Sequence, residues 1–379
     1  MMLAPLLLAL VGAALVGIIL WDAFETILEP RRIGRRVRLT RYFYLLTWRA
    51  WRAYALTLRK TSTREGILGI YGPLSLIGLL ACWAAGLVTS FAMLQIAAAL
   101  GQGLPIGHFQ HVLYMSGETF FTLGFGDVTP NSSLGRFLAV LEAGLGFGFL
   151  GTVVGYLPTM YASFAQRELE ITLLDARAGS PPTAAEFLGR IEGHGEPLLC
   201  DAQLRSWERW SAQLLETHIS YPQLAYYRSQ HNNQSWLATL TVILDSSSVV
   251  LARSGDATAS QARLTFAMAR HALVDITQIF VPTYRPGAAD RLDAAARERL
   301  RAGLMGTSFA LPETPEFDQS LAELRLMYEP YAQALAAHLL FELPPWVNTR
   351  LRRDNWLGGP WDRQLHEMRD AGLEHEVHF

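Results

Sequence analysis

Three long apolar stretches in the first half of the chain dominate its hydrophobic pattern. They cover about residues 3–21, a part of 67–100, and about 134–161. A helix needs about 20 apolar residues to cross the roughly 30 Å of hydrocarbon in a bilayer, so each stretch is long enough. No Asp, Glu, Lys or Arg occurs in residues 66–117, which contain the second stretch. The pattern therefore predicts three membrane-spanning helices.

The first stretch has the length of a signal peptide as well as that of a span. No basic residue precedes the apolar run, and the residues that follow it, Asp22 and Glu25, do not suggest a cleavage site. We therefore expect an uncleaved span within residues 1–30.

The loop after the first stretch sets the expected orientation. Residues 31–60 contain ten basic residues and no acidic residue. Short loops rich in Arg and Lys stay in the cytoplasm. This predicts an outside N-terminus, a cytoplasmic segment 31–64, a second span rising outward, a third span returning, and a cytoplasmic segment 163–379.

The basic segment itself has two interpretations. Four arginines recur at every third position, as in a voltage-sensing helix: Arg32, Arg35, Arg38 and Arg41. Such a sensor packs in a four-helix bundle, but only one span precedes this segment. From 42 to 58, aromatic residues and Leu alternate with Arg49 and Arg52, which is typical of an amphipathic helix on the anionic inner leaflet. We favour this interfacial helix for residues 31–64.

Composition agrees with a membrane protein and excludes several other classes. Half of the residues are hydrophobic and only 17% are charged, whereas soluble domains carry about a quarter charged residues. The net charge of −2 gives no sign of a nucleic-acid partner. Cys82 and Cys200 fit no disulfide or metal spacing, and no phosphate-binding loop or catalytic triad pattern occurs. We therefore predict that the chain is not an enzyme and holds no resident metal or cofactor.

The most informative motif lies between the second and third apolar stretches. Residues 116–130 read SGETFFTLGFGDVTP. Glycines at alternate positions, Gly124 and Gly126, allow left-handed backbone conformations that turn carbonyl groups toward one axis. A row of such carbonyls, repeated around a symmetry axis, can replace the hydration shell of K⁺.

Residues 122–127, Thr-Leu-Gly-Phe-Gly-Asp, resemble the selectivity filter of the potassium-channel family, whose signature is Thr-Val-Gly-Tyr-Gly-Asp. The resemblance implies an all-α membrane protein of the prokaryotic two-span type, with an extra N-terminal span and a pore domain in 65–162. It implies that K⁺ binds to five consecutive residues: Thr122, Leu123, Gly124, Phe125 and Gly126. One loop cannot enclose an ion, so it also implies a homotetramer. Leu for Val and Phe for Tyr leave a weakly selective cation channel as the alternative.

Around the filter, residues 108–121 are expected to form a pore helix too short to span. The negative end of its dipole would favour a cation in the cavity. The resemblance places Glu118 behind the filter and Asp127 at its outer mouth, close enough to share a proton. The alternative is that Glu118 contacts backbone N–H groups.

The third stretch contains the expected gate. Five glycines lie on it: Gly144, Gly146, Gly148, Gly151 and Gly155. Each lowers helix stability by about 1 kcal/mol relative to Ala, and glycines also permit close packing. The resemblance places Gly146 at the hinge glycine of the family, with Val154 and Pro158 at the narrow inner mouth. Packing alone is the alternative role.

Two further features of this stretch need an interpretation. Residues 145–148 repeat the letters Leu-Gly-Phe-Gly, but they lack the flanking Thr and Asp and lie mid-span, so we reject them as a second filter. Glu142 is ionisable and lies within the membrane, where such residues face a cavity or the protein interior. We favour a hydrogen bond behind the pore helix over a contribution to the potential of the cavity.

The remaining half of the chain reads as helical. The inner helix is expected to continue through 162–178, and Gly179-Ser180-Pro181-Pro182 should end it. Further helices are predicted at 183–192, 201–218, 222–230, 235–251, 260–280, 288–304, 315–342 and 360–371. The apolar segment 235–251 contains Asp245, so a buried core helix is favoured over a span. No nucleotide-binding glycine pattern and no β-rich module follows the inner helix.

Residues 163–379 are therefore predicted to be an all-α cytoplasmic regulatory domain that gates the pore through the inner helix. Its ligand cannot be named from the pattern. A polar cluster could bind a small cytoplasmic ligand or could be a loop between helices, and we favour the loop: His218, Tyr221, Tyr227, Arg228, His231, Asn232, Asn233, Gln234 and Trp236. The expected function is passive K⁺ conduction across a plasma membrane, the bacterial inner membrane. A rival of another class is a non-conducting membrane sensor or scaffold.

Overall fold

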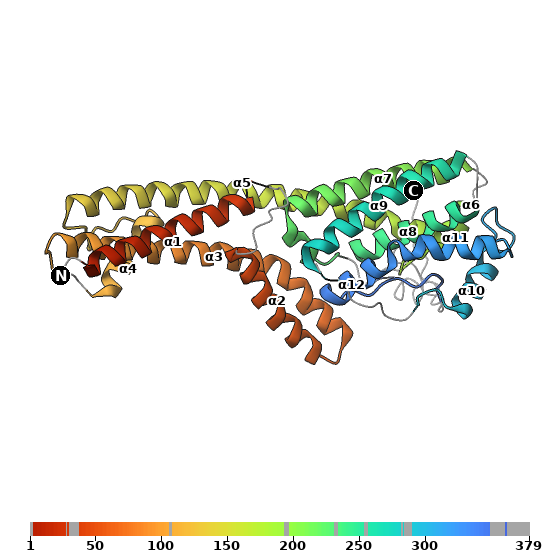
Figure 1. Cartoon of the computed structure of the whole chain (residues 1–379), viewed down its shortest axis with the longest axis horizontal. Helices are drawn as coiled ribbons and strands as arrows, with labels where there is room; N and C mark the ends of the chain where they lie inside the picture. The colour runs from red at the N-terminus through yellow and green to blue at the C-terminus, as the bar shows by residue number, and fades with distance from the viewer. Residues whose placement is uncertain are drawn as a thin grey trace, which may run out of the picture. The chain divides into compact units, whose positions relative to one another are not determined.

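All regular secondary structure is helical in the part of the chain that the computed structural model describes (Figure 1). That part comprises residues 3–27, 29, 38–105, 108–192, 197–230, 234–253, 257–281, 283, 290–348 and 361. It contains no strand. The predicted all-α fold class is therefore confirmed.

The chain divides into two compact units. Unit 1 holds Met1–Phe164 together with Thr217–Arg228, and unit 2 holds Ala165–Glu216 together with Ser229–Phe379. A short piece of the second half of the chain thus folds with the first half. We call Thr217–Arg228 the return segment.

Unit 1 is built on three long helices and two shorter ones: α1 (Leu3–Ile27), α2 (Leu39–Thr57), α3 (Thr61–Gly101), α4 (Phe109–Phe120) and α5 (Ser133–Ala178), which continues into unit 2. The three predicted spans lie within α1, α3 and α5, each long and apolar enough to cross a membrane. The predicted pore helix is α4, which begins at Phe109 after His108.

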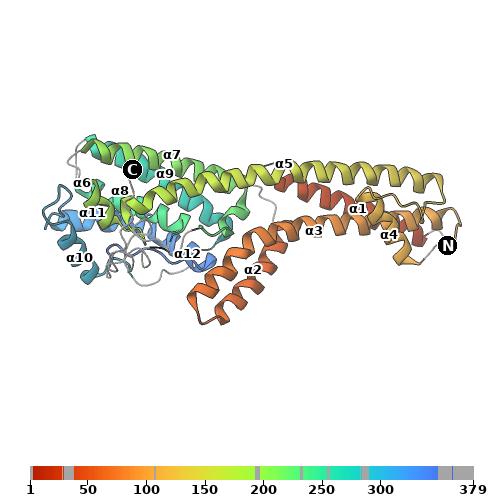
Figure 2. The ribbon, with the colours of Figure 1, turned by 180° about the vertical axis from the view of Figure 1, so that it is seen from behind.

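Helices α1 and α3 pack closely and antiparallel, as both views of the ribbon show (Figures 1 and 2). A Cβ on Gly12 would lie 3.0 Å from the Leu94 Cγ, and a Cβ on Gly86 would lie 2.7 Å from the Ile19 Cδ1. Small residues let the backbones of helices approach, which is the usual basis of helix association in lipid. This contact fixes the extra N-terminal helix along the outer helix of the expected pore.

Two buried carboxylates lie at the end of α1. Asp22 accepts hydrogen bonds from the Trp83 Nε1 of α3 at 3.0 Å and from the Thr40 Oγ1 at 2.6 Å. It also accepts the backbone N–H of Thr40 at 3.1 Å, in the first turn of α2. Glu25 pairs with Arg38 at 3.4 Å. Asp22 therefore ties the start of α2 to both α1 and α3.

Helix α2 has one packed face and one exposed face. Trp48 and Ala55 are buried. The exposed face carries apolar side chains, namely Leu39, Tyr42, Leu45, Leu46, Tyr54 and Leu56. Arg41 and Arg49 are exposed beside them. This mixture is what an interfacial helix needs. Of the four arginines that recur at every third position, Arg32 and Arg35 lie outside the described residues.

Unit 2 contains the other α-helices: α6 (Ala184–Glu192), α7 (Pro197–Ser220, whose last residues belong to the return segment), α8 (Trp236–Arg253), α9 (Ala257–Phe280), α10 (Ala294–Leu304), α11 (Pro315–Leu326) and α12 (Glu329–Leu339). Helix α10 begins later than the predicted 288, after the N-cap Asp293, whose side chain accepts the Ala296 N–H. The predicted helix at 360–371 lies outside the described residues, apart from Trp361.

Two predicted helices differ from the structure in kind. Residues 222–230 were expected to form an α-helix, but only the 3₁₀ helix η1 (Pro222–Tyr226) forms there. Residues 315–342 were expected to form one helix. The structure has two helices instead, because Pro330 lies in the first turn of α12. Proline lacks the N–H that a helix interior requires and is well suited to a helix start.

Helix α8 is a buried core helix of unit 2, although it is apolar enough to be a fourth candidate span. Its Asp245 is fully buried and accepts hydrogen bonds from the Tyr328 hydroxyl and from the Arg291 Nη2, the latter at 2.7 Å. The Arg291 Nε in turn donates to Glu329 at 2.9 Å, and its guanidinium lies over the Trp346 ring. A charged network thus fastens α8 to the C-terminal helices of the described part.

We expect the substitution Arg291→Met to lower the opening free energy of α8 by about 3–5 kcal/mol, because it leaves a buried carboxylate without its guanidinium partner. Hydrogen exchange of residues 236–253 in the full-length protein measures this change. The matched control is Arg205→Met, which removes an exposed pair with Asp201 and should cost less than about 1 kcal/mol. Equal exchange in the two variants would refute a stabilising role for the network.

Candidate functional site

The backbone of the loop between α4 and α5 alternates in handedness. Thr122, Gly124 and Gly126 have φ angles of 57°, 63° and 77°, in the left-handed region, whereas the residues between them do not. Carbonyls of an ordinary extended chain point alternately to opposite sides. Reversing every second residue can instead direct successive carbonyls to one side.

Thr122 shows that this conformation is imposed on the sequence. Glycine adopts a left-handed φ without cost, but a β-branched residue is a genuine outlier there. The cost for an L-residue is roughly 1–2 kcal/mol. Strained residues of this kind persist where the surrounding structure holds them, and they gather at functional sites.

Helix α4 holds the start of this loop by its last carbonyls. The Leu123 N–H donates to the Glu118 carbonyl at 2.8 Å, and the Thr122 N–H donates to the Thr119 carbonyl at 3.1 Å. The end of α4 is thus hydrogen-bonded to the loop itself. A shift of α4 would therefore move Thr122 and Leu123 with it.

In a single chain the loop is largely open to solvent. The exposed fractions of Leu123 and Phe125 are 59% and 69%. Exposed large apolar side chains at such density usually mark a surface that another molecule covers. The role of residues 122–126 as an ion filter stays a prediction.

The two predicted filter-supporting carboxyl groups lie in different environments. Glu118 is buried, and its Oε2 has no hydrogen-bond partner in the described structure. Asp127 is exposed and accepts the backbone N–H of Val128 at 3.1 Å. Among the described residues, no hydrogen bond joins these two side chains. Their shared proton stays a prediction.

Gly146 lies where α5 touches the end of α4. A Cβ there would overlap the carbonyl oxygen of Phe120 and would lie 2.7 Å from its carbonyl carbon and 3.0 Å from its Cα. By contrast, a Cβ on Gly144 or Gly148 would meet no atom within 4 Å. Of these three glycines, Gly146 alone is required by close packing. This observation supports packing as one role, and the hinge stays a prediction.

The predicted gate residues lie on the open side of α5. Val154 and Pro158, one helical turn apart, are exposed in the single chain, while Tyr156 and Met160 are buried. Helix α5 is unbroken at Pro158. The rejected second motif, residues 145–148, is helical and lies within α5.

Three side chains that the sequence analysis did not assign make hydrogen bonds that hold α4 and the start of α5 in place. The Gln95 Nε2 of α3 donates to the Gly135 carbonyl at 2.9 Å, and Ser132 accepts the Gly135 N–H at 2.9 Å. Ser116 of α4 is hydrogen-bonded to Glu142 of α5. The favoured interpretation of Glu142, a hydrogen bond behind the pore helix, is therefore observed. For Glu142, the signal in the sequence was an ionisable residue within a long apolar stretch.

The polar cluster predicted around 218–236 is divided between the two units. Tyr221, Tyr227 and Arg228 belong to the return segment in unit 1, whereas Gln234 and Trp236 belong to unit 2. Its middle part, 231–233, lies outside the described residues. A small cytoplasmic ligand stays a prediction.

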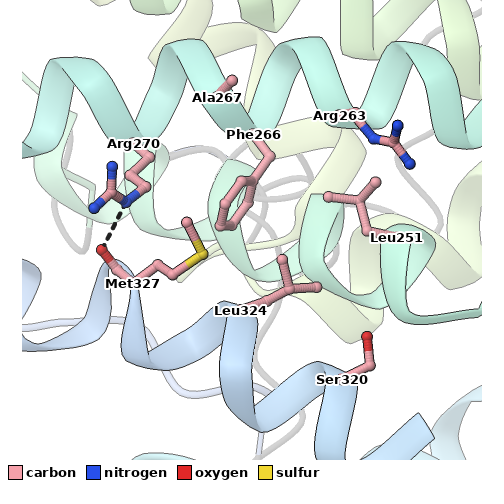
Figure 3. Close-up of a pocket in the computed structure, with 8 residues that line it drawn as sticks. All are labelled: Leu251, Arg263, Phe266, Ala267, Arg270, Ser320, Leu324 and Met327. Atoms are coloured by element: carbon pink, nitrogen blue, oxygen red, sulfur yellow. Dashed lines mark hydrogen bonds between the residues drawn. The ribbon is translucent and has the colours of Figure 1, made fainter. Parts of the chain in front are cut away.

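Unit 2 has an open pocket of about 460 Å³ between α8, α9 and α11 (Figure 3). Apolar side chains form most of its wall, with Arg263 and Arg270 on the α9 side. The Arg270 Nε donates to the Met327 carbonyl at 3.0 Å, as the dashed line in Figure 3 marks. Nothing in the described structure indicates what would fill this pocket.

Comparison with known proteins bears on the loop between α4 and α5 and on the helices around it. Residues 77–163, which run from α3 through the loop into α5, match a protein-family model described as "Ion channel". The match supports an ion channel. It covers the three positions of left-handed backbone, all of α4 and the first part of α5, and it leaves the C-terminal half of the chain unmatched. No curated protein and no solved structure matches the chain.

The family match and the apolar helices together indicate a multi-pass membrane protein that moves ions. They point to transport rather than catalysis. In the described residues, no group of three or more His, Cys, Asp or Glu side chains could hold a metal ion. Both cysteines are free, Cys82 exposed and Cys200 buried.

Proposed function

We propose that the chain is one subunit of a homotetrameric, K⁺-selective channel in the bacterial inner membrane. The observation that carries the proposal is the left-handed backbone at Thr122, Gly124 and Gly126 in the loop between two candidate spans. Four such loops around an axis would present rings of carbonyl oxygens, which can replace the hydration shell of K⁺. Passive flux through such a pore needs no cofactor and no catalytic group.

A second, independent argument supports the location of the filter on the outer side. The ten basic residues of 31–60 favour a cytoplasmic position for the start of α3. The opposite end of α3, followed by α4 and the loop, then faces outward. Helix α2 would lie on the anionic inner leaflet, with its exposed Leu and Tyr side chains in the headgroup region and Arg41 and Arg49 near lipid phosphates.

Flux through the purified protein in liposomes tests the proposal. We expect K⁺ efflux from loaded vesicles, and we expect Gly124→Ala to abolish it, because a Cβ at a φ of 63° is strained and displaces the carbonyl. The matched control is Gly103→Ala, because Gly103 has a similar φ of 69° but lies in the turn between α3 and α4. Absence of any K⁺ flux in the wild type, with Gly124→Ala making no difference, would favour a non-conducting sensor or scaffold.

Selectivity is measured in the same preparation by reversal potentials with K⁺ on one side and Na⁺ on the other. A strong preference for K⁺ supports the proposal. Equal permeability would favour the weakly selective cation channel, as the Phe125 and Leu123 departures from the family signature allow.

Gating through the C-terminal half is supported by the return segment, which packs against the cytoplasmic part of α5 within unit 1. The Gln223 side chain is hydrogen-bonded to the Tyr156 hydroxyl and lies 3.7 Å from the Met160 Sδ. The rings of Tyr221 and Tyr156 are 5.4 Å apart. These contacts are made on the buried side of α5, opposite Val154 and Pro158.

The same segment also contacts the outer helix. A Cβ on Gly72 of α3 would lie 2.6 Å from the Tyr227 ring, so this ring lies directly on the backbone of α3. Arg228 pairs with Glu65 at 3.6 Å. Burial lowers the pKa of Arg228 to about 10, although the charge of Glu65 partly offsets this effect. Packing the return segment against α3 therefore removes the Arg228 guanidinium from water. The charge of Glu65 offsets only part of the cost of this burial.

Helix α2 completes the surroundings of the return segment. Tyr226 stacks on Tyr44 with ring centroids 5.6 Å apart and an interplanar angle of 3°. Its ring also lies 4.9 Å from Trp48 and 5.1 Å from Tyr71 of α3. Because the segment is covalently joined to unit 2 at both ends, a rearrangement in unit 2 would act on α2, α3 and α5 together. We propose that it transmits the gating signal.

A further inference from the structure

Ser116 lies at the centre of a polar contact that joins three helices. Its hydroxyl oxygen is 2.7 Å from the carbonyl oxygen of Val88 on α3, and it is also hydrogen-bonded to the Glu142 Oε1 on α5. Ser116 and Glu142 are both 1% exposed. The contact is therefore shut off from solvent on all three helices.

The number of protons decides the direction of these two hydrogen bonds. A serine hydroxyl has one proton to donate, and a backbone carbonyl can only accept. If Ser116 donates to the Val88 carbonyl, its bond to Glu142 requires the proton to come from the Glu142 carboxyl. If Glu142 were ionised, one of the two short contacts would join two lone pairs without a proton.

The surroundings of Glu142 offer no compensation for a negative charge. No Asp, Glu, Lys or Arg occurs on α3 from residue 66 onward. Helix α4 carries His111 near its far end and Glu118, itself acidic. On α5 the nearest basic residue is Arg136, six residues away, or about 9 Å along the axis. The Glu142 Oε2 has no hydrogen-bond partner in the described structure. A buried charge without a partner is far more costly than a buried neutral group.

We propose that Glu142 is a neutral carboxylic acid at neutral pH and acts as a positioning residue for the filter. Its Oε1–H donates to the Ser116 Oγ, and the Ser116 hydroxyl donates to the Val88 carbonyl. This relay fastens the pore helix between the inner and outer helices with every proton used once.

The relay acts together with the glycine contact one turn further along. Ser116 meets Glu142 and Phe120 meets Gly146, so positions four apart on α4 meet positions four apart on α5. Both contacts lie on one face of each helix. Because the end of α4 is hydrogen-bonded to Thr122 and Leu123, the relay fixes the height of the filter relative to the inner helix.

Infrared spectroscopy of the full-length protein in lipid at neutral pH tests the protonation state. We expect Glu142→Gln to remove a carboxylic-acid C=O band and to leave the carboxylate bands unchanged. Ser116→Ala should shift that band, because it removes the acceptor of the acid proton. Glu118→Gln is the matched control for the other buried carboxyl of this region. Loss of a carboxylate band on Glu142→Gln would overturn the proposal.

The positioning role rests on the proposed function and has its own readout. Glutamine can donate to Ser116 as the acid does, so Glu142→Gln should keep the K⁺-to-Na⁺ permeability ratio. Glu142→Leu cannot donate, and we expect the ratio to fall about tenfold, the size of one lost buried hydrogen bond. An unchanged ratio in Glu142→Leu would overturn positioning. The infrared result stands whether or not the protein conducts, so the two failures are distinguishable.

Discussion

Replacing Gly146 with Ala is expected to abolish K⁺ flux through the reconstituted protein. The added Cβ would overlap the Phe120 carbonyl oxygen. This neighbour is backbone at the end of the pore helix, so it cannot rotate away as a flexible side chain could. Either α5 or α4 must move, and α4 holds Thr122 and Leu123 by hydrogen bonds. The substitution should therefore displace the filter as well as loosen the packing. Flux from loaded liposomes measures the loss.

Gly148→Ala is the matched control, because it lies in the same helix and a Cβ there would meet no atom of the chain within 4 Å. It should stabilise α5 by about 1 kcal/mol, the usual difference between Gly and Ala in a helix. Normal flux in Gly146→Ala would contradict the packing role. Measuring the stability of the proposed tetramer in detergent separates a packing role of Gly146 from a hinge role. A packing defect lowers the stability, whereas loss of a hinge leaves a stable tetramer with altered opening.

The sequence predicted the features that depend on local pattern. Apolar length located α1, α3 and α5, because a span must be long and apolar whatever it packs against. Alternate glycines located the left-handed positions Gly124 and Gly126, since only glycine adopts them without cost. Asp245 within an apolar run was read as a buried helix, and α8 is one. These properties belong to single elements and can be read along the chain.

The features that the sequence did not reveal depend on partners far away in the chain. Asp22 and Trp83 are 61 positions apart, and Gln223 and Tyr156 are 67 apart. Neither pair has a spacing that a helical or extended pattern would indicate. The left-handed φ of Thr122 is likewise missed by propensity, because a β-branched residue adopts it only when its surroundings impose it. Tertiary contact decides all three.

The return segment shows the same limit at the level of domains. Its local pattern, with Pro222 and several tyrosines, reads as part of the C-terminal domain. In the structure its Tyr226 is buried among the rings of Tyr44, Trp48 and Tyr71, all in unit 1. An aromatic cluster of this kind has no sequence periodicity, because its four rings come from three separate helices. It can be found only once the helices are placed.

Replacing Tyr226 with Ala is expected to change the open probability of the channel by more than about tenfold, a shift of about 1.4 kcal/mol between closed and open states. Truncating a buried aromatic side chain costs about 3–5 kcal/mol of packing, so the return segment would release α2 and the adjoining part of α3. The released segment would no longer hold Gln223 against Tyr156 and Met160 on the inner helix. Single-channel recording in planar bilayers measures the open probability.

The design separates gating from damage to the filter. Tyr226 lies far along the chain from residues 122–126, and its ring packs against Tyr44, Trp48 and Tyr71. The K⁺-to-Na⁺ permeability ratio and the conductance of one open channel should therefore stay unchanged while the open probability moves. Tyr54→Ala is the matched control, since it removes an exposed tyrosine from α2. If Tyr226→Ala gates like wild type, the return segment is only a packing element, and unit 2 must act on the pore through the continuous helix α5 alone.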